Sequence, residues 1–339
     1  KFYFEKGAFN SRDLPAMMHA IEHRGPDDKG DYADGRIALG FTRLSIIDTI
    51  SGHQPLFNED KSIVVVANGE IYNFRELRED LVSQGHRFRT WSDCEVILHL
   101  YEEYGEQCVE RLNGMFAFCL YDSRREKAIV ARDRMGIKPL YFYHDEKLMA
   151  FGSEIKGVVA SEDVPCRRRE GVLDEYLCFR SLSHGRTFFA DIEALEPGTC
   201  IIAGPDGLRL RRFWNNERNE IIDDEQTIVR RIDEVLNECV QRQMVSDVPL
   251  GSLLSGGVDS SWVTAIAGRH LQGMDTFTVG FAEKDYDETI YARSLASTNG
   301  LEYHELKIGN RESADILPRI IWFHDEPLTH ANSVQIYLI

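Results

Sequence analysis

The regular alternation of apolar strand patterns with helical patterns after residue 225 is the feature that most constrains the fold. In chain order it predicts a helix at 227–243, a strand at 248–254, a helix at 260–270, a strand at 276–281, a helix at 288–299, a strand at 302–308 and a helix at 314–323. Strands that alternate with helices imply a parallel, doubly wound sheet, whose ligand site lies at the carboxyl ends of the strands.

A different pattern occupies the first half of the chain. Short strands separated by turn residues are predicted at 36–41, 62–68, 115–122, 127–132, 140–144 and 147–152, with helices at 73–84 and 93–104. This mixture predicts an α+β domain. The stretch 193–225 is polar and rich in turn residues, so we expect a loop-like joint there, with one domain over 1–205 and a second over 220–339.

Charge and cysteine content exclude several classes of protein. The 339 residues contain 39 Lys and Arg against 56 Asp and Glu, which gives a net charge of −17. Nonspecific electrostatic binding to nucleic acid or anionic lipid is therefore not expected. No apolar stretch approaches the roughly 20 residues that cross a bilayer, and no membrane partner is expected. The seven cysteines never form a C-x-x-C pair, which argues against a disulfide framework and a structural zinc site and predicts a cytoplasmic location.

A glycine-rich loop, Ser255-Gly256-Gly257-Val258-Asp259-Ser260-Ser261, lies between a predicted strand and a predicted helix. Its backbone amides and hydroxyls converge on a helix N-terminus, which carries partial positive charge and binds phosphate oxygens. The loop is neither the G-x-x-x-x-G-K-S/T phosphate loop nor the G-x-G-x-x-G dinucleotide turn. An ordinary strand-to-helix turn with Ser260 as its N-cap is the alternative.

The S-G-G-x-D-S pattern resembles the pyrophosphate loop of the ATP pyrophosphatase superfamily, whose members split ATP into AMP and pyrophosphate. The resemblance implies ATP and Mg²⁺ as ligands, with Asp259 as the metal-linked carboxylate. The implied phosphate contacts are Ser255, Gly256, Gly257, Ser260 and Ser261. The implied adenosine neighbours are Leu253, Val279 and Gly280, although Leu253 and Val279 could equally be core residues.

Four blocks in the first half of the chain are jointly specific. They are His23-Arg24-Gly25-Pro26-Asp27, Arg43-Leu44-Ser45-Ile46-Ile47-Asp48, Asn68-Gly69-Glu70-Ile71-Tyr72-Asn73 and Ser92-Asp93-Cys94-Glu95. In this order, ahead of the SGGVDSS loop, they resemble class II glutamine amidotransferases of the asparagine synthetase type. The resemblance continues through 112–118, 132–140 and 153–156 and covers nearly the whole chain. It implies an N-terminal nucleophile αββα sandwich as the glutaminase domain, followed by an α/β synthetase domain related to adenine nucleotide alpha hydrolases.

The resemblance assigns a glutamine pocket whose residue types fit the substrate. Glutamine presents an α-carboxylate, an α-ammonium and a side-chain amide, so a selective pocket needs a cation, an anion and an oxyanion hole. The assigned contacts are Arg43 for the carboxylate, Glu70 and Asp93 for the ammonium, Asn68 and Gly69 as oxyanion donors, and Ile46 as a further contact. Taken singly, Arg43 or Asp93 could be a solvated surface charge.

The expected nucleophile is not among the residues of the sequence. The family attacks the amide with an N-terminal cysteine whose own α-amine serves as the base, and its opening C-G-I-x-G run would lie immediately upstream of Lys1. The sequence lacks an initiator Met and stops inside an apolar pattern, so we expect a fragment of a longer protein. A missing N-terminus is favoured over a loss of glutaminase activity, because the pocket blocks are intact. The seven cysteines cannot substitute, since none carries a free α-amine.

The combined prediction is an enzyme with two sites, expected as a homodimer. Glutamine hydrolysis supplies ammonia, which converts an ATP-activated carboxylate acceptor into an amide. The acceptor loop is expected at Thr329, His330 and Asn332, and the asparagine-forming types differ at the positions of His330 and Asn332. A uronic acid or a natural-product acid is therefore an alternative to aspartate, and the family's later acidic motif would lie beyond Ile339.

Two functions of other classes remain open. One is an ATP-dependent ligase without glutaminase activity, like the β-lactam-forming relatives, and the intact N-G-E-I-Y-N block argues against it. The other is a regulatory glutamine-binding module, which the complete SGGVDSS loop disfavours.

Overall fold

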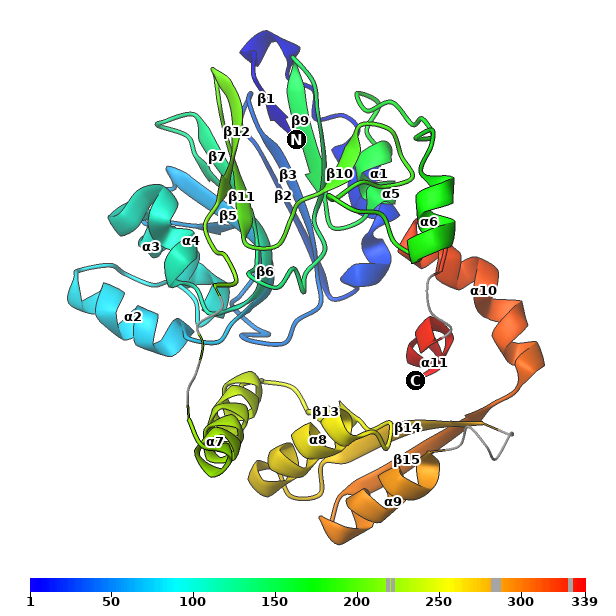
Figure 1. Cartoon of the computed structure of the whole chain (residues 1–339). Helices are drawn as coiled ribbons and strands as arrows, with labels where there is room; N and C mark the ends of the chain where they lie inside the picture. Colours follow the sequence, from blue (N-terminus) through cyan, green and yellow to red (C-terminus); the bar gives the residue numbers. More distant parts are fainter. Residues whose placement is uncertain (218–219, 221–222, 282–287, 329–331) are drawn as a thin grey trace. The chain divides into compact units, whose positions relative to one another are not determined.

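The computed structural model describes residues 1–217, 220, 223–281, 288–328 and 332–339. The chain divides into two compact units, Lys1–Glu217 and Arg218–Ile339. Each unit has its own sheets and helices, as Figure 1 shows.

Two antiparallel sheets form the centre of the first unit. The six-stranded sheet has the order β12-β11-β7-β6-β5-β4, and its strands are β4 (Leu56–Phe57), β5 (Ile63–Ile71), β6 (Gly114–Asp122), β7 (Lys127–Arg132), β11 (Thr199–Gly204) and β12 (Gly207–Arg212). The four-stranded sheet has the order β1-β9-β8-β10, and its strands are β1 (Phe2–Tyr3), β8 (Tyr141–His144), β9 (Leu148–Gly152) and β10 (Ile192–Ala194). A separate hairpin pairs β2 (Asp28–Ala33) with β3 (Ala38–Arg43).

The main core lies between the two sheets. Phe142 and Met149 of the four-stranded sheet join Val64 and Val130 of the six-stranded sheet in one buried cluster. The neighbours of Met149 along β9, Leu148 and Ala150, belong instead to a second cluster with Ile155, because successive side chains of a strand point to opposite faces. Both faces of the four-stranded sheet are therefore covered by buried side chains, as an αββα sandwich requires. The predicted αββα fold is confirmed.

Helices cover the outer faces of the sandwich. They are α1 (Leu14–Ala20), α2 (Phe74–Ser83), α3 (Val96–Tyr104), α4 (Cys108–Arg111), α5 (Ile155–Val159) and α6 (Leu173–Phe179), with short 3₁₀ turns η1 (Lys6–Ala8), η2 (Glu22–Arg24), η3 (Asp93–Glu95) and η4 (Gly105–Gln107). Helix α1 packs against α5 and β3, whereas α3 packs against β5. Residues Val96 to Tyr101 of α3 are all buried, as expected of a helix that is apolar on most of its circumference.

The six strands and two helices predicted in the first half of the chain are present, but the predicted joint was wrong in part. The stretch 193–225 contains most of β10 and all of β11 and β12. Strand β11 pairs with β7, and β12 pairs with β11, so the first unit extends past residue 205 to Glu217. The polar turn Gly204-Pro205-Asp206-Gly207 is the tip of this hairpin. Its residue types are typical of a loop, so the buried strand β11 beside it was not predicted.

The second unit has a three-stranded parallel sheet of order β13-β14-β15. Its elements are α7 (Glu225–Gln243), β13 (Gly251–Leu253), α8 (Val258–His270), β14 (Asp275–Phe281), α9 (Thr289–Thr298), β15 (Glu302–Ile308), α10 (Asn310–His324) and α11 (Asn332–Leu338). Leu254, Ala267 and Ala292 form a buried cluster that joins the sheet region to α8 and α9. The predicted alternation of strands and helices is thereby confirmed.

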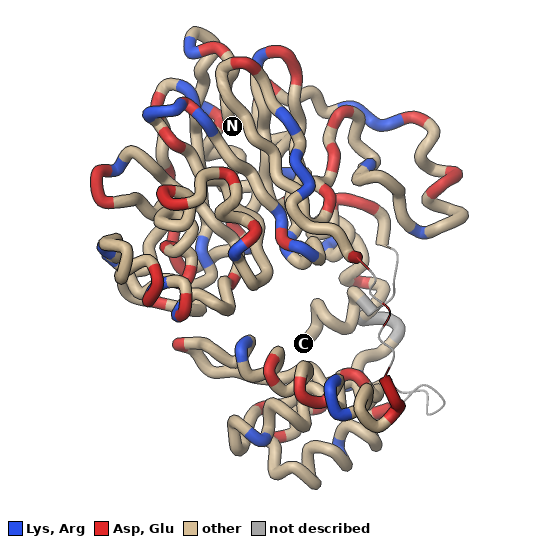
Figure 2. Tube along the Cα trace, turned by 60° about the vertical axis from the view of Figure 1, so that its left-hand side comes forward, with Lys and Arg blue, Asp and Glu red and all other residues tan. Residues whose placement is uncertain are grey.

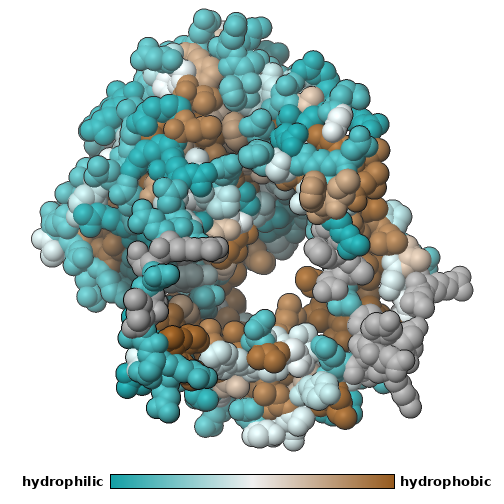
Figure 3. Space-filling model, viewed as in Figure 1, coloured by the Kyte–Doolittle hydropathy of each residue, from teal (hydrophilic) through white to brown (hydrophobic). Residues whose placement is uncertain are grey.

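The surfaces of both units carry charged residues of both signs and some exposed hydrophobic residues. Acidic and basic residues are interspersed along the trace (Figure 2), and many form exposed ion pairs such as Arg124–Asp60. Hydrophobic residues reach the surface of the second unit (Figure 3), where Ile228, Ile232 and Val235 on α7 are exposed at helical spacing. Among the residues that the structure describes, no helix is both long and apolar enough to span a bilayer.

A buried carboxylate organises the connection between β7 and β8. Asp133 is fully buried and accepts four backbone hydrogen bonds, from the N–H groups of Phe116 at 3.2 Å and of Met135, Ile137 and Lys138 at 3.0 Å each. One side chain therefore satisfies the amides of a whole turn.

Replacing Asp133 with Asn should lower the free energy of unfolding of the first unit by about 2–4 kcal/mol. The amide nitrogen would face N–H donors that a carboxylate oxygen now accepts, leaving buried groups unpaired. The exposed Asp145, which accepts from the amides of Lys147 and Leu148, is the matched control, and Asp145→Asn should cost less than about 1 kcal/mol. Hydrogen exchange of amides within 1–217 measures both, and equal losses would contradict the assigned role.

Candidate active sites

A cavity of about 260 Å³ lies within the first unit and brings together every residue that the sequence prediction assigned to glutamine. These residues are Arg43, Ile46, Asn68, Gly69, Glu70 and Asp93. They come from the end of β3 and the segment after it, from the end of β5, and from η3. Three of the four sequence blocks thus meet in the cavity, and Arg24 of the fourth also lines it.

Arg43 is the cation of the cavity. Its side chain is buried, and its Nη2 donates to the carbonyl oxygens of Ile47 at 2.9 Å and Asp48 at 2.8 Å. Its Nη1 is buried without a hydrogen-bond partner among the described residues. A buried guanidinium N–H that lacks an acceptor is costly, so this nitrogen is available for an anionic ligand in the cavity.

Two carboxyl groups lie in the same cavity. Asp93 Oδ2 accepts a hydrogen bond of 2.7 Å from the Ile71 amide. Burial raises the pKa of Asp93 to about 6, and the nearby Glu70 carboxyl raises it further while the Ile71 amide opposes the rise. Burial also raises the pKa of Glu70, an effect that Lys138 partly offsets. Burial in the folded protein disfavours the ionised form of both carboxyl groups. A bound cation would stabilise their negative charges and so offset this effect.

Asn68 and Gly69 lie side by side near the end of β5. The register pairs Gly69 with Phe116 of β6, and a Cβ at Gly69 would lie only 2.2 Å from the Met115 carbonyl oxygen. Only glycine fits this close approach of two strands. Both residues border the cavity, and their role as oxyanion donors stays a prediction.

The structure adds residues to the cavity that the sequence prediction did not assign. Lys138 lines it, and burial lowers the pKa of its amine while Glu70 opposes this. Cys94 and Lys1 line it as well. Lys138 belongs to the block at 132–140, so its place in the resemblance was the available signal. For Lys1 the signal was the expected position of the family's cysteine run directly before it.

The SGGVDSS loop of the second unit joins β13 to α8, as predicted. Helix α8 begins directly after Gly257, and Ser255 Oγ lies 2.9 Å from Ser260 Oγ. Gly256 has a φ of +89°, and a Cβ there would lie 2.6 Å from the Glu288 carbonyl oxygen, so the turn requires glycine. Asp259 is exposed in the first turn of α8 and Ser261 follows on the same helix. The loop therefore presents hydroxyls, amides and one carboxylate at a helix N-terminus.

The predicted adenosine neighbours differ in their surroundings. Leu253, at the end of β13, is about half exposed, whereas Val279 on β14 packs against a buried cluster around Ile308. Gly280 is buried on the same strand. Of the predicted acceptor loop, Thr329 and His330 lie outside the described residues, and Asn332 is the first residue of α11.

Comparisons with known proteins agree with this arrangement. A family model described as a glutamine amidotransferase domain matches residues 3–214, and one described as asparagine synthase matches residues 231–339. Glutamine-hydrolysing asparagine synthetase 1 of Bacillus subtilis strain 168 is 36% identical over 328 residues, covering 96% of this chain and 52% of that protein. Glutamine-hydrolysing asparagine synthetase 3 of Arabidopsis thaliana is 37% identical over 318 residues, covering 90% of this chain and 49% of that protein.

A third relative is covered more completely. The putative glutamine-hydrolysing asparagine synthetase 2 of Methanocaldococcus jannaschii is 32% identical over 354 residues, covering 96% of this chain and 68% of that protein. The chain spans about half the length of the two relatives from Bacillus and Arabidopsis. Both family models and all three relatives agree, and the chain belongs to the family of glutamine-hydrolysing asparagine synthetases.

Proposed function

We propose that the protein transfers the amide nitrogen of glutamine to a carboxylate acceptor that ATP has activated. The observation that carries the proposal is the unpartnered Nη1 of Arg43, which shares one cavity with the carboxyl groups of Glu70 and Asp93. A cation and two anions in this arrangement match the α-carboxylate and α-ammonium of a free amino acid. Glutamine hydrolysis is assigned to the first unit and ATP chemistry to the second.

In the first unit, a thiolate would attack the side-chain amide of glutamine and release ammonia, and water would then free glutamate from the thioester. The negative oxygen of the tetrahedral intermediate needs donors, which Asn68 and the Gly69 amide supply in this proposal. The N-terminal cysteine of the family would precede Lys1. Lys1 lines the cavity, so a residue placed directly before Lys1 would lie at the cavity wall.

In the second unit, ATP would adenylate the acceptor carboxylate with release of pyrophosphate, and ammonia would displace AMP to form the amide. The SGGVDSS loop supports this role because its amides and hydroxyls lie at the N-terminus of a 13-residue helix. The exposed carboxylate of Asp259 beside the loop fits Mg²⁺, which keeps several waters and screens phosphate charge when bound.

The acceptor is proposed as aspartate or another carboxylate, such as a sugar uronic acid or a natural-product acid. A panel of carboxylates with glutamine and Mg·ATP, scored by pyrophosphate release, identifies it. If no carboxylate stimulates pyrophosphate release but glutamine still binds, the protein is a glutamine-binding module instead. If pyrophosphate release occurs without glutamate formation in a protein that begins with the family's cysteine, it is a ligase without glutaminase activity.

Replacing Arg43 with Ala should weaken glutamine binding by roughly ten- to a hundred-fold, since a charge-assisted hydrogen bond to the α-carboxylate is lost. Calorimetric titration with glutamine measures this directly. Arg124→Ala, which removes an exposed guanidinium, is the control and should bind normally. Amidation from added ammonium salts should persist in Arg43→Ala. Equal impairment with ammonia would show that Arg43 serves the fold rather than glutamine.

The affinity for glutamine should fall as the pH falls through about 6, approaching tenfold per pH unit. Asp93 must be ionised to pair with the ammonium, and its pKa in the free protein is raised to about 6, so protonation competes with binding below that value. Titrations across this range should show the dependence in the wild type and a weaker one in Asp93→Asn. A flat profile in the wild type would place the ammonium away from Asp93.

Replacing Asp259 with Asn should reduce acceptor-dependent pyrophosphate release by at least about a hundred-fold, because a carboxylate next to the triphosphate is removed. Glutamate release should be nearly unchanged, since the glutamine cavity lies in the other unit. Asp233→Asn on the exposed surface of α7 is the matched control. A parallel fall of both activities would contradict the assignment of the two reactions to separate units.

A further inference from the structure

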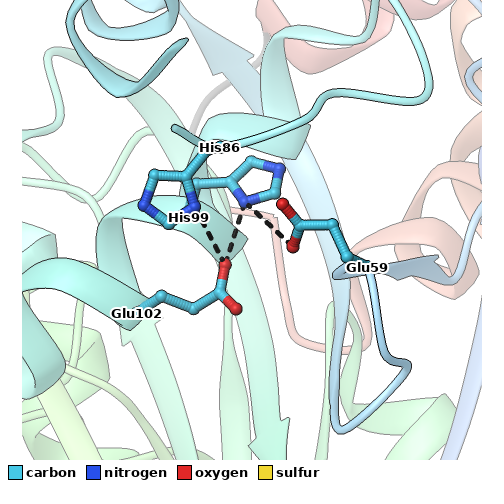
Figure 4. A group of neighbouring side chains, drawn as sticks. All are labelled: Glu59, His86, His99 and Glu102. Atoms are coloured by element: carbon cyan, nitrogen blue, oxygen red, sulfur yellow. Dashed lines mark hydrogen bonds and ion pairs between the residues drawn. The ribbon is translucent and has the colours of Figure 1, made fainter. Parts of the chain in front are cut away.

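A group of four metal-ligand side chains converges in the first unit, away from the glutamine cavity. Glu59 lies between β4 and β5, His86 follows α2, and His99 and Glu102 lie three residues apart on α3, so that they share one face of that helix. Among the residues that the structure describes, one ligand atom from each lies within 4.8 Å of the other three. Figure 4 shows both imidazole rings and both carboxylates pointing toward one another.

Three of the six distances between these ligand atoms are close to the spacing of a tetrahedral site. His99 Nδ1 lies 2.9 Å from Glu102 Oε2 and 3.9 Å from Glu59 Oε2, and His86 Nδ1 lies 3.4 Å from Glu102 Oε2. In tetrahedral Zn²⁺ sites with bonds of about 2.0–2.1 Å, neighbouring ligand atoms are roughly 3.3 Å apart. The three distances scatter around that value, so shifts below about 1 Å would bring the four atoms to bonding distance of one ion.

The second polar atom of three of these ligands is already hydrogen-bonded elsewhere. His86 Nε2 lies 2.9 Å from Glu103 Oε1, Glu102 Oε1 accepts from Asn58 at 2.8 Å, and Glu59 Oε1 accepts from the Arg87 amide at 2.9 Å. Metal-bound histidines and carboxylates are oriented by such outer partners, and a carboxylate behind an imidazole raises its basicity. The ring nitrogen of His86 that faces the cluster is thereby fixed as Nδ1.

The remaining ligand, His99, has weaker support at Nε2, the ring nitrogen that faces away from the cluster. Its Nε2 is buried, has no hydrogen-bond partner in the part of the chain that the structure describes, and lies 3.8 Å from Glu95 Oε1. Glu95 in turn accepts from the amides of Arg89 and Thr90. A small movement of the His99 ring toward a bound ion or toward Glu95 would complete the same carboxylate-imidazole arrangement that His86 has with Glu103.

The cluster also has an opening to solvent. Side-chain exposure rises from 0% for His99 and 12% for His86 to 23% for Glu102 and 36% for Glu59. An ion could therefore enter on the side of the two carboxylates, as a binding site requires.

We propose that Glu59, His86, His99 and Glu102 form a site for one divalent transition-metal ion, with Zn²⁺ as its natural occupant. The ligands contain no cysteine, so the spacing of the cysteines in the sequence could not indicate the site. Two imidazoles and two carboxylates suit Zn²⁺ better than Mg²⁺ or Ca²⁺, which prefer oxygen ligands only. Four protein ligands leave no open position, so the ion would be structural.

The ion would tie three separate segments together, and one of these segments leads to the glutamine cavity. The segment 84–92 runs from α2 to η3, where Asp93 lines the cavity. Arg87 of that segment is bonded to Glu59, and Thr90 is bonded to Glu95. A metal bound to His86 and Glu59 would hold the beginning of segment 84–92 in place. Glu95 already holds the later part of this segment through its hydrogen bond with Thr90.

Without a metal, a proton balances part of the negative charge. Burial lowers the pKa of His99, but the carboxylates of Glu102, Glu95 and Glu59 outweigh this and raise the pKa to about 9. A protonated His99 surrounded by carboxylates is therefore the competing description, in which the cluster is an ion-pair network and binds no metal. Metal binding to the purified protein separates the two descriptions.

The test uses the full chain, freed of metal by a chelator and titrated with Zn²⁺ and with Co²⁺ in the absence of nucleotide. We expect one Zn²⁺ per chain to remain through gel filtration, and the Co²⁺ form to show the visible absorption of tetrahedral coordination. Zn²⁺ should also raise the thermal midpoint of the first unit. These readouts do not depend on amidotransfer, so they stand or fall separately from the proposed function.

Variants locate the site. His86→Gln and Glu59→Gln, at the partly exposed ligands, should each weaken Zn²⁺ binding by at least about a hundred-fold. Glu103→Gln should weaken it by roughly 10–100-fold, because it removes only the negative charge of the partner behind His86. His19→Gln, which removes an exposed histidine paired with Glu22, is the matched control and should bind as the wild type does.

Three outcomes would overturn the proposal. The first is a wild-type affinity no higher than that of His86→Gln or Glu59→Gln. The second is a Co²⁺ spectrum typical of octahedral, hydrated ions. The third is thiolate absorption in the Co²⁺ form, which would place the ion at exposed cysteines such as Cys166 or Cys239.

Discussion

The antiparallel pairing of β5 with β6 is the constraint on which the first unit and its cavity depend. Residues 63–67 of β5 are buried in the core, and the strand pairs with β6 from Ile63 to Ile71 without interruption. Core packing therefore fixes the position of the whole strand, including its polar end. That end carries Asn68, Gly69 and Glu70 into the cavity, and the amide of Ile71 meets Asp93. A rigid strand thus positions several groups of the site at once.

Many residues of the sequence blocks act as supports rather than as parts of the cavity. Asp48 accepts from Arg43 of its own block through its carbonyl oxygen and from the amide of Trp91, which directly precedes the fourth block, through its side chain. Glu154 lies 3.0 Å from His23 Nε2 and accepts from Arg24 at 2.9 Å, which joins the first block to the segment at 153–156. These charge-assisted contacts hold segments that are distant in the sequence next to one another.

The two proposed catalytic sites differ in how they are prepared for their ligands. The glutamine cavity is lined largely by buried residues, and the carboxyl groups of Asp93 and Glu70 already have raised pKa values before a ligand binds. The SGGVDSS loop is instead exposed and relies on backbone amides at a helix N-terminus, which suits a ligand with several phosphate oxygens. The histidine-carboxylate cluster around His99 shares η3 with the cavity through Glu95, so a structural ion there would act on the same segment that carries Asp93.

The alternation of strands and helices, the position of the SGGVDSS loop and the residues predicted to line one cavity could be read from the sequence, because each depends on local periodicity or on a contiguous block. The sequence could not reveal that β11 and β12 belong to the first unit, since a short buried strand beside a polar turn looks like a loop. Nor could it indicate the convergence of Glu59, His86 and His99, which are separated by 13 to 40 residues. Only tertiary packing brings such residues together, because no local pattern records which strand or helix will lie beside another.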